Sequence, residues 1–151
     1  MRFTTRIFFA VLLVLSCLNG QTQILTPVHW SYGAKKINAT EAVVFIKATI
    51  DQGWHLYSQT VGEGGPVKTT FAFAPSAAYT LNGATQEPTP IVRMESAFNM
   101  KVAFFERSVI FQQKVKVKKL PVVVKGTVEY MTCNDEKCLP PDTQSFNITI
   151  K

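Results

Sequence analysis

Short apolar runs, separated by residues that favour turns, follow one another through most of the chain. The run at 109–117 shows the pattern best, because Val115 and Val117 alternate with Lys114 and Lys116. This period of two is expected for a strand with one buried and one solvated face. The strands predicted in this way lie at residues 28–32, 41–50, 54–58, 69–73, 79–81, 102–105, 109–117, 121–130 and 145–150.

The stretches between these runs favour turns and loops. Residues 51–53 read Asp-Gln-Gly, Gly33 ends the first predicted strand, and the glycine-rich segment 62–66 does not suit a strand interior. A further loop is predicted at 96–101. No segment combines a helix cap with a sustained helical period. Short strands at regular spacing predict a single all-β domain, an immunoglobulin-like β-sandwich without the antibody pattern of one cysteine in each sheet.

The first twenty residues differ in kind from the rest. Arg2 and Arg6 precede an apolar run at 7–15, and small and polar residues follow at 16–20. This order is typical of a bacterial secretory signal peptide, which we predict at residues 1–20. The apolar run has nine residues, whereas a helix needs about 20 to cross a membrane. We therefore expect an exported protein with no transmembrane span in its mature part.

The end of the signal peptide leaves two forms of the mature protein open. Cys17 lies in a loose lipobox and would become the acylated first residue of a lipoprotein. Ordinary cleavage near residue 20 would instead release a soluble domain spanning 21–151. We expect a periplasmic or otherwise exported protein, with lipid anchoring through Cys17 as the alternative.

The positive charge changes this picture little. The net charge of +6 includes Arg2 and Arg6, and much of the rest comes from the lysines of residues 114–119. Their alternation with valine predicts a solvated strand face, with an anionic lipid or an acidic partner as less favoured readings. We expect no nucleic-acid partner in this compartment, and a monomer.

Two cysteines, Cys133 and Cys138, remain once Cys17 is removed or acylated. In an oxidising compartment they are expected to form a disulfide. A bridge across so short a loop stabilises a fold by only about 2 kcal/mol, against about 4–5 kcal/mol for a loop of a hundred residues. The pair is thus an inefficient staple, and both a redox role and a structural role stay open.

Metal binding is the least favoured reading of the pair. Zinc takes four ligands, and only His29, His55 and scattered carboxylates could complete a site. We expect no metal and no cofactor. Nearby charge does not decide which sulfur reacts, since Lys137 favours a thiolate while Asp135 and Glu136 oppose it.

Three segments resemble one known family. The cysteine segment, 126–133 with 138–141, is similar to the active-site hairpin of the N-terminal periplasmic domain of the thiol:disulfide interchange protein DsbD. Residues 53–57, Gly-Trp-His-Leu-Tyr, resemble its aromatic strand, and residues 98–101, Phe-Asn-Met-Lys, resemble its cap loop. The resemblance covers nearly all of the predicted mature chain.

The resemblance implies an immunoglobulin-like sandwich that exchanges electrons with thioredoxin-fold proteins. It implies that Cys138 is the sulfur attacked to form a mixed disulfide and that Cys133 is the resolving thiol. Phe98 matches an aromatic cap over the pair, and Trp54 and Tyr57 match aromatics that line the pocket. Each of these three aromatics could instead be ordinary core.

His55 raises a separate question. Its side chain is predicted on the strand face opposite Trp54, and it could act on a thiol proton. A surface or hydrogen-bonded structural histidine is the favoured reading.

The sequence also departs from the best-known members of the family. The four residues between the cysteines are more charged, and full-length DsbD continues into a membrane domain and a thioredoxin-like domain. We therefore expect a stand-alone, Bacteroidetes-like version of the domain, a possible protein-disulfide reductase supplied by a thioredoxin-like donor and a membrane electron transporter. The alternatives are a non-catalytic immunoglobulin-like envelope module that binds a partner and uses the disulfide as a staple, and a redox sensor or scaffold.

Overall fold

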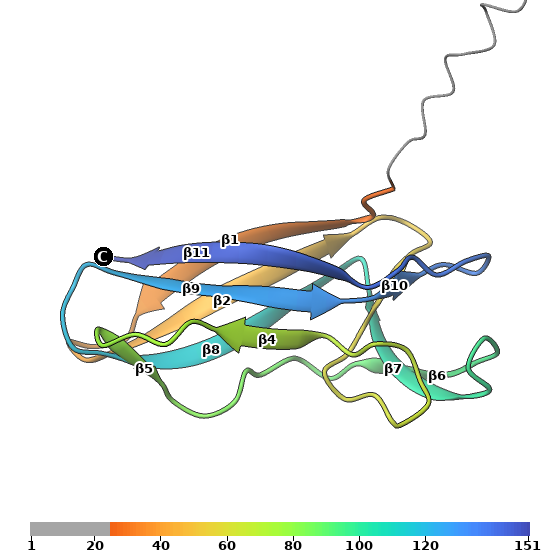
Figure 1. The fold of residues 1–151 in the computed structure, drawn as a ribbon, viewed down its shortest axis with the longest axis horizontal. Helices are drawn as coiled ribbons and strands as arrows, with labels where there is room; N and C mark the ends of the chain where they lie inside the picture. The colour runs from red at the N-terminus through yellow and green to blue at the C-terminus, as the bar shows by residue number, and fades with distance from the viewer. Residues whose placement is uncertain (1–24) are drawn as a thin grey trace, which may run out of the picture.

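The computed structural model describes residues 25–151 and consists of β-strands joined by turns and loops (Figure 1). The predicted signal peptide at 1–20, including Cys17, lies outside the described residues. Within residues 25–151 no helix is long and apolar enough to cross a membrane.

Two antiparallel sheets form the body of the molecule (Figure 1). One has the order β1-β2-β8-β5 and the other the order β11-β9-β4. Strands β1 and β11 lie side by side along one edge of the two layers. The strands of the first sheet are β1 (Val28–Lys36), β2 (Glu41–Ile50), β8 (Ser108–Val117) and β5 (Tyr79–Leu81), and those of the second are β11 (Asp142–Ile150), β9 (Val122–Tyr130) and β4 (Thr70–Phe73).

Alternation of buried and exposed residues produces the core between these layers. In β8 every second residue is buried, beginning with Val109, and the lysines point to solvent as predicted. Phe111 from β8 packs with Ile46 from β2 and with Val124 and Ile148 from β9 and β11 in one cluster. Burial of these apolar side chains is the main source of stability for the sandwich.

A third, smaller sheet lies at the end of the molecule opposite the C-terminus (Figure 1). Its order is β10-β3-β7-β6, and its strands are β10 (Thr132–Cys133), β3 (His55–Tyr57), β7 (Met100–Glu106) and β6 (Ile91–Glu95). Paired residues on neighbouring strands share a face. One face of this sheet sends Leu56 and Phe105 into the main core, while Tyr57 and Phe104 on the other face form a second cluster with Cys133.

Apart from small shifts at strand ends, the predicted strands agree with the structure except at three places. β1 does not end at Gly33, which pairs with Phe45, and continues to Lys36. That prediction was wrong because a glycine is tolerated inside this exposed edge strand. An added Cβ atom at Gly33 would meet nothing within 4 Å, so no side chain is needed there for packing. The sequence analysis also missed β6, which has no buried residue to create an alternation, and β10, which has only two residues.

Candidate redox site

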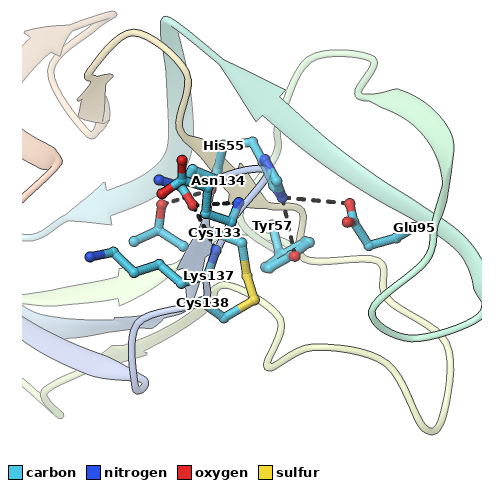
Figure 2. Close-up of a disulfide and its surroundings, with 9 residues drawn as sticks. His55, Tyr57, Glu95, Cys133, Asn134, Lys137 and Cys138 are labelled. Carbon is cyan, nitrogen blue, oxygen red and sulfur yellow. Dashed lines mark hydrogen bonds and ion pairs between the residues drawn. A yellow bond between two sulfur atoms is a disulfide. The ribbon is translucent and has the colours of Figure 1, made fainter.

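The two cysteines form a disulfide across a short hairpin, residues 132–139, which begins with β10 (Figure 2). Their Cα atoms are 4.0 Å apart, and the two residues make an isolated antiparallel bridge. Cys133 is only 1% exposed, whereas Cys138 is half-buried. An attacking thiol from outside the molecule therefore reaches Cys138 more readily than Cys133.

Asn134 holds the loop between the cysteines in shape. Its side-chain Oδ1 accepts hydrogen bonds from the backbone N–H groups of Glu136 and Lys137, at 2.9 and 2.8 Å. Its own N–H donates to the Lys137 carbonyl at 2.9 Å. Such bonds from an asparagine to the backbone just ahead are a common way to close a tight turn. They leave the charged side chains of the loop exposed around the sulfur pair.

The hairpin is fixed to β3 by short contacts. Thr132 Oγ1 donates a hydrogen bond of 2.7 Å to the His55 carbonyl, and Cys133 pairs with His55 in the sheet. The floor beneath the disulfide consists of Tyr57, Val102 and Phe104, which are almost wholly buried. Half-buried side chains pack around it: Val61, Phe98, Met100, Met131 and Cys138.

Phe98 lies in the turn that joins β6 to β7. Glu95 and Met100 form the last pair of this hairpin, and the Phe98 N–H donates to the Glu95 carbonyl at 3.2 Å. Asn99 completes the turn with a φ of 52°, a left-handed conformation that asparagine tolerates better than most residues. The Phe98 ring stands edge-on to Tyr57, with centroids 6.1 Å apart. The structure thus brings the predicted cap residue to the cluster that contains both cysteines.

Trp54 is not brought to this cluster. It is half-buried and packs against the main core, as Leu56 does, while Tyr57 faces the disulfide. The alternation of side chains along β3 explains this separation, because residues 54 and 57 cannot both point to the same face of one regular strand. Of the two predicted pocket residues, Trp54 directly precedes β3 and Tyr57 lies in it, and only Tyr57 packs with Cys133.

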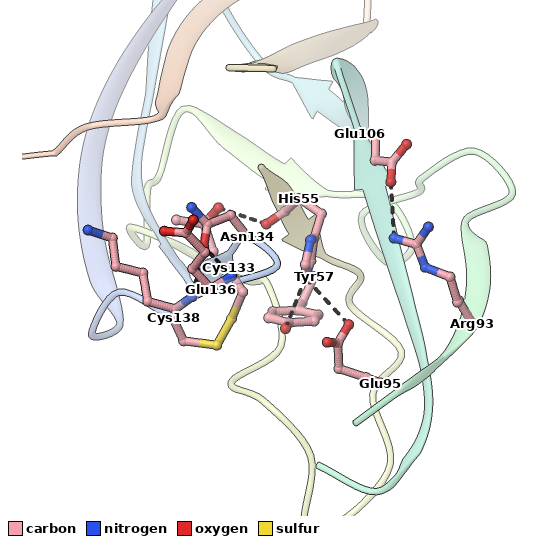
Figure 3. Close-up of polar contacts among 11 residues, drawn as sticks. His55, Tyr57, Arg93, Glu95, Glu106, Cys133, Asn134, Glu136 and Cys138 are labelled. Atoms are coloured by element: carbon pink, nitrogen blue, oxygen red, sulfur yellow. Dashed lines mark hydrogen bonds and ion pairs between the residues drawn. A yellow bond between two sulfur atoms is a disulfide. The ribbon is translucent and has the colours of Figure 1, made fainter. Parts of the chain in front are cut away.

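A buried polar group adjoins the aromatic floor (Figure 3). His55 is 3% exposed and packs against the Phe104 ring at 4.9 Å. Its Nε2 atom lies 3.1 Å from the Tyr57 hydroxyl and 3.6 Å from Oε2 of Glu95. On the outer side of Phe104, Arg93 lies over the ring at 4.7 Å and pairs with Glu106 at 3.2 Å.

Burial controls the protonation of this group. Desolvation lowers the pKa of His55, an effect that the Glu95 carboxylate opposes. Two effects raise the pKa of Tyr57 well above its ordinary value: desolvation is the larger, and repulsion from the Glu95 carboxylate is the smaller. Tyr57 therefore remains a neutral phenol, and its proton is available for a hydrogen bond to neutral His55.

The other histidine plays no part in the site. His29 pairs with Asp51 at 3.1 Å on the exposed surface. Within the part of the chain that the structure describes, no three His, Cys, Asp or Glu side chains gather closely enough to hold a metal ion.

Two residues of the site were not identified from the sequence. Asn134 follows directly after a cysteine at a strand end, and asparagine at the start of a turn is a usable signal. Glu95 carried no such signal, because the strand that presents it was itself missed. In the small sheet β3 and β6 lie on either side of β7, so the contact between His55 and Glu95 depends on a strand order that the sequence does not reveal.

Comparison with protein families finds one match for this chain. A family model described as "Thiol:disulfide interchange protein DsbD, N-terminal" matches residues 21–150. The matched range contains both cysteines and all the site residues described above. A search of the curated proteins gave no match.

Solved structures share the fold at low sequence identity. The DsbD N-terminal domain of Neisseria meningitidis in its reduced form is 15% identical, with a TM-score of 0.52 over 83% of this chain and 90% of that one. The same domain in its complex with the PilB N-terminal domain is 14% identical, with a TM-score of 0.54 over 83% and 88%.

A third structure extends the comparison. The N-terminal periplasmic domain of ScsB from Proteus mirabilis is 18% identical, with a TM-score of 0.61 over 82% of this chain and 48% of that one. At these identities the likeness concerns the fold alone, and it confirms the predicted immunoglobulin-like β-sandwich.

Proposed function

The chain belongs to the family of DsbD N-terminal domains, and on that premise we propose that it passes electrons from a thioredoxin-like donor to oxidised envelope proteins through Cys133 and Cys138. The resemblance found in the sequence is thereby confirmed, and the family takes part in thiol–disulfide exchange. Direction of electron flow and choice of partners are the parts that we propose.

The observation that carries this proposal is the unequal placement of the two sulfurs. Cys133 is buried against the aromatic floor, and Cys138 is half-buried at the edge of the same cluster, on the face of the small sheet that does not join the main core. A staple would gain nothing from this arrangement, whereas exchange needs one sulfur that a partner can reach and one that it cannot.

The proposed reaction has two stages, each of which moves two electrons. A thiolate of the donor attacks Sγ of Cys138, the Cys133–Cys138 bond breaks, and Cys133 leaves as a thiolate that takes up a proton. The second thiol of the donor then attacks the donor's own sulfur in the mixed disulfide. This step releases Cys138 as a thiol and leaves the donor oxidised.

In the second stage the thiolate of Cys138 attacks a disulfide of the oxidised envelope protein, and one thiolate of that protein leaves. Cys133, deprotonated, then attacks Sγ of Cys138. This restores the Cys133–Cys138 bond and releases the second thiol of the substrate. The net result is that one dithiol of the donor is oxidised to a disulfide and one disulfide of the substrate is reduced to a dithiol.

We propose the periplasm as the compartment, either in soluble form or anchored through Cys17, and a membrane electron transporter as the source that keeps the donor reduced. The similar ScsB domain is periplasmic, and the Neisseria complex pairs a DsbD N-terminal domain with a PilB N-terminal domain. Both are consistent with exchange between exported proteins.

Trapping tests the reaction directly. We expect Cys133→Ser, which keeps Cys138 but cannot resolve a mixed disulfide, to accumulate disulfide-linked complexes with thioredoxin-fold proteins in an envelope extract. Cys138→Ser is the matched control and should trap far less, because its remaining sulfur is buried. Equal trapping by both variants, or none by either, would contradict the proposed roles.

A redox titration separates the proposal from the alternative of a structural staple in a binding module. An exchange centre should titrate between about −180 and −270 mV, whereas a structural bridge lies below about −300 mV. A reduction potential below about −300 mV would favour the non-catalytic module.

A further inference from the structure

One polar contact joins β3, beside the floor of the site, to the end of β6 from which the Phe98 turn begins. His55 belongs to β3, and Glu95 is the last residue of β6, immediately before the turn that carries Phe98. Oε2 of Glu95 lies 3.6 Å from Nε2 of His55, and its carbonyl accepts the N–H of Phe98. Figure 3 shows Glu95 pointing inward to His55 and Tyr57. A contact that holds Glu95 in place therefore also holds the start of the turn that carries Phe98.

Apart from Glu95, the β6 side chain that reaches the floor is Arg93, which lies over the Phe104 ring and pairs with Glu106. The first four residues of β6 are exposed, and Ile91, Val92 and Met94 present apolar side chains to solvent. β6 is an edge strand that pairs only with β7. At the turn itself, the contacts with the site are the Phe98 ring on Tyr57, the Glu95 carboxylate near His55 and the packing of Met100 in the same cluster as Phe98.

We propose that His55 and Glu95 are positioning residues for the exchange reaction, whose contact holds the turn between β6 and β7 against the floor and so sets how fast a thiol reaches the Cys133–Cys138 bond. The inference rests on the proposed function for its biological meaning. Because the contact would control access to the disulfide, it should affect the reaction with any thiol, including a small reagent.

The strength of this contact depends on the charge of His55. A neutral imidazole at 3.6 Å from a carboxylate makes a weak contact, whereas an imidazolium in the same place makes an ion pair and can donate a charge-assisted hydrogen bond. Buried pairs of this kind are less screened than surface pairs. The turn between β6 and β7 should therefore be held more tightly as the pH falls and His55 gains a proton.

Several charged groups face His55 and set the pH at which it gains a proton. Burial and Arg93 lower the pKa of His55, and the carboxylates of Glu95, Glu106 and Asp135 raise it, with burial the largest effect and a lowered pKa the result. These groups come from β6, β7 and the cysteine loop. Asp51 and Arg107 line the adjoining hollow, and Tyr57 stays a neutral phenol. The change therefore falls below the ordinary histidine pKa of about 6.5.

The test compares two glutamates that both face His55. Glu95→Gln and Glu106→Gln each remove one negative charge, but only Glu95 adjoins the turn that carries Phe98, whereas Glu106 is at the far end of β7. The rate of disulfide reduction by dithiothreitol is measured between pH 5 and pH 8, and each variant is expressed as a ratio to wild type, so that ionisation of the reagent cancels. Circular dichroism checks that each variant is folded.

We expect Glu95→Gln to be reduced about three- to tenfold faster than wild type at pH 5, the size of a modest charged contact. The ratio should fall towards one at pH 8, where His55 is neutral in both proteins. Glu106→Gln should stay within about twofold of wild type throughout. A ratio for Glu95→Gln that does not change with pH, or equal effects of the two variants, would overturn the proposal.

A measurement on the wild-type protein covers the case in which a variant does not fold. The NMR signals of the His55 ring and of the Phe98 ring should shift with the same pH midpoint. Independent midpoints, or a Phe98 signal that does not respond, would equally overturn the proposal. Because neither measurement involves a protein partner, failure of the trapping experiment and failure of this inference are distinguishable.

Discussion

At the scale of single residues, we propose that access to the disulfide depends on one aromatic ring, which is half-buried. Phe98 rests on Tyr57 in the same cluster as the disulfide and is carried by the turn between β6 and β7. A side chain placed in this way can cover the sulfurs in the resting state and be displaced by a partner. Exchange with unsuitable thiols would then be slower than exchange with proteins that displace the ring.

Removal of this ring should open the site. An edge-to-face aromatic pair contributes about 0.5–1.5 kcal/mol beyond its buried area. We therefore expect Phe98→Ala to speed reduction by a small thiol roughly three- to tenfold, measured at one pH by quenching and thiol labelling.

Phe73→Ala is a suitable control for this experiment. Phe73 is also half-buried but packs against the main core. It should leave the rate of reduction unchanged under native conditions, even if it lowers stability. A rate for Phe98→Ala no different from wild type would show that the ring does not limit access.

The residues of the site differ in how far the sequence could predict them. Spacing and compartment were enough to single out Cys133 and Cys138, and Phe98 came from the family resemblance. Trp54, which the resemblance predicted in the pocket, packs against the main core, and alternation along the predicted strand already placed it on the face opposite Tyr57. Glu95 could not be found, because its role depends on a partner 40 positions earlier in the sequence that approaches it only in the folded sheet.

At the scale of elements, strands were predictable where one face is buried. The regular alternation in β8 follows directly from its position between solvent and core. β6 gives no such pattern, because an edge strand outside the sandwich has no buried apolar face to create it. Turn residues misled at Gly33, where glycine lies within an exposed edge strand rather than at its end.

Two glycines in strands should respond in opposite ways to substitution. A Cβ atom on Gly126 in β9 would lie 2.5 Å from the Ala72 carbonyl oxygen and 2.5 Å from Cζ of Phe146, whereas one on Gly33 would meet nothing within 4 Å. We expect Gly126→Ala to lower the free energy of unfolding by about 1–3 kcal/mol, the usual cost of overpacking.

Gly33→Ala is the matched control for this change. It should be neutral or stabilise by up to about 1 kcal/mol, because alanine loses less backbone entropy on folding. Urea unfolding of both variants measures the two effects. Similar losses in the two strands would contradict the close packing of β9 against β4 and β11.

At the scale of the whole molecule, the structural and chemical parts are separate. The sandwich core lies between the two large sheets, and the disulfide lies on the outer face of the small sheet at one end. The strand β3 serves both, with Leu56 in the core and Tyr57 in the site. A protein that alternates between disulfide and dithiol needs this separation, since its fold must survive both states.

Reduction of the disulfide should therefore cost little global stability. A bridge across a loop this short contributes about 2 kcal/mol by restricting the unfolded chain, whereas loss of a buried core ring such as Phe111 costs about 3–5 kcal/mol. We expect urea unfolding with and without reductant to differ by no more than about 2 kcal/mol at equal slope. The variant with both cysteines changed to serine should match the reduced protein, and Phe111→Ala should lose more than either. A reduced protein as unstable as Phe111→Ala would mean that the disulfide supports the sandwich itself, which is the behaviour of a staple rather than of an exchange centre.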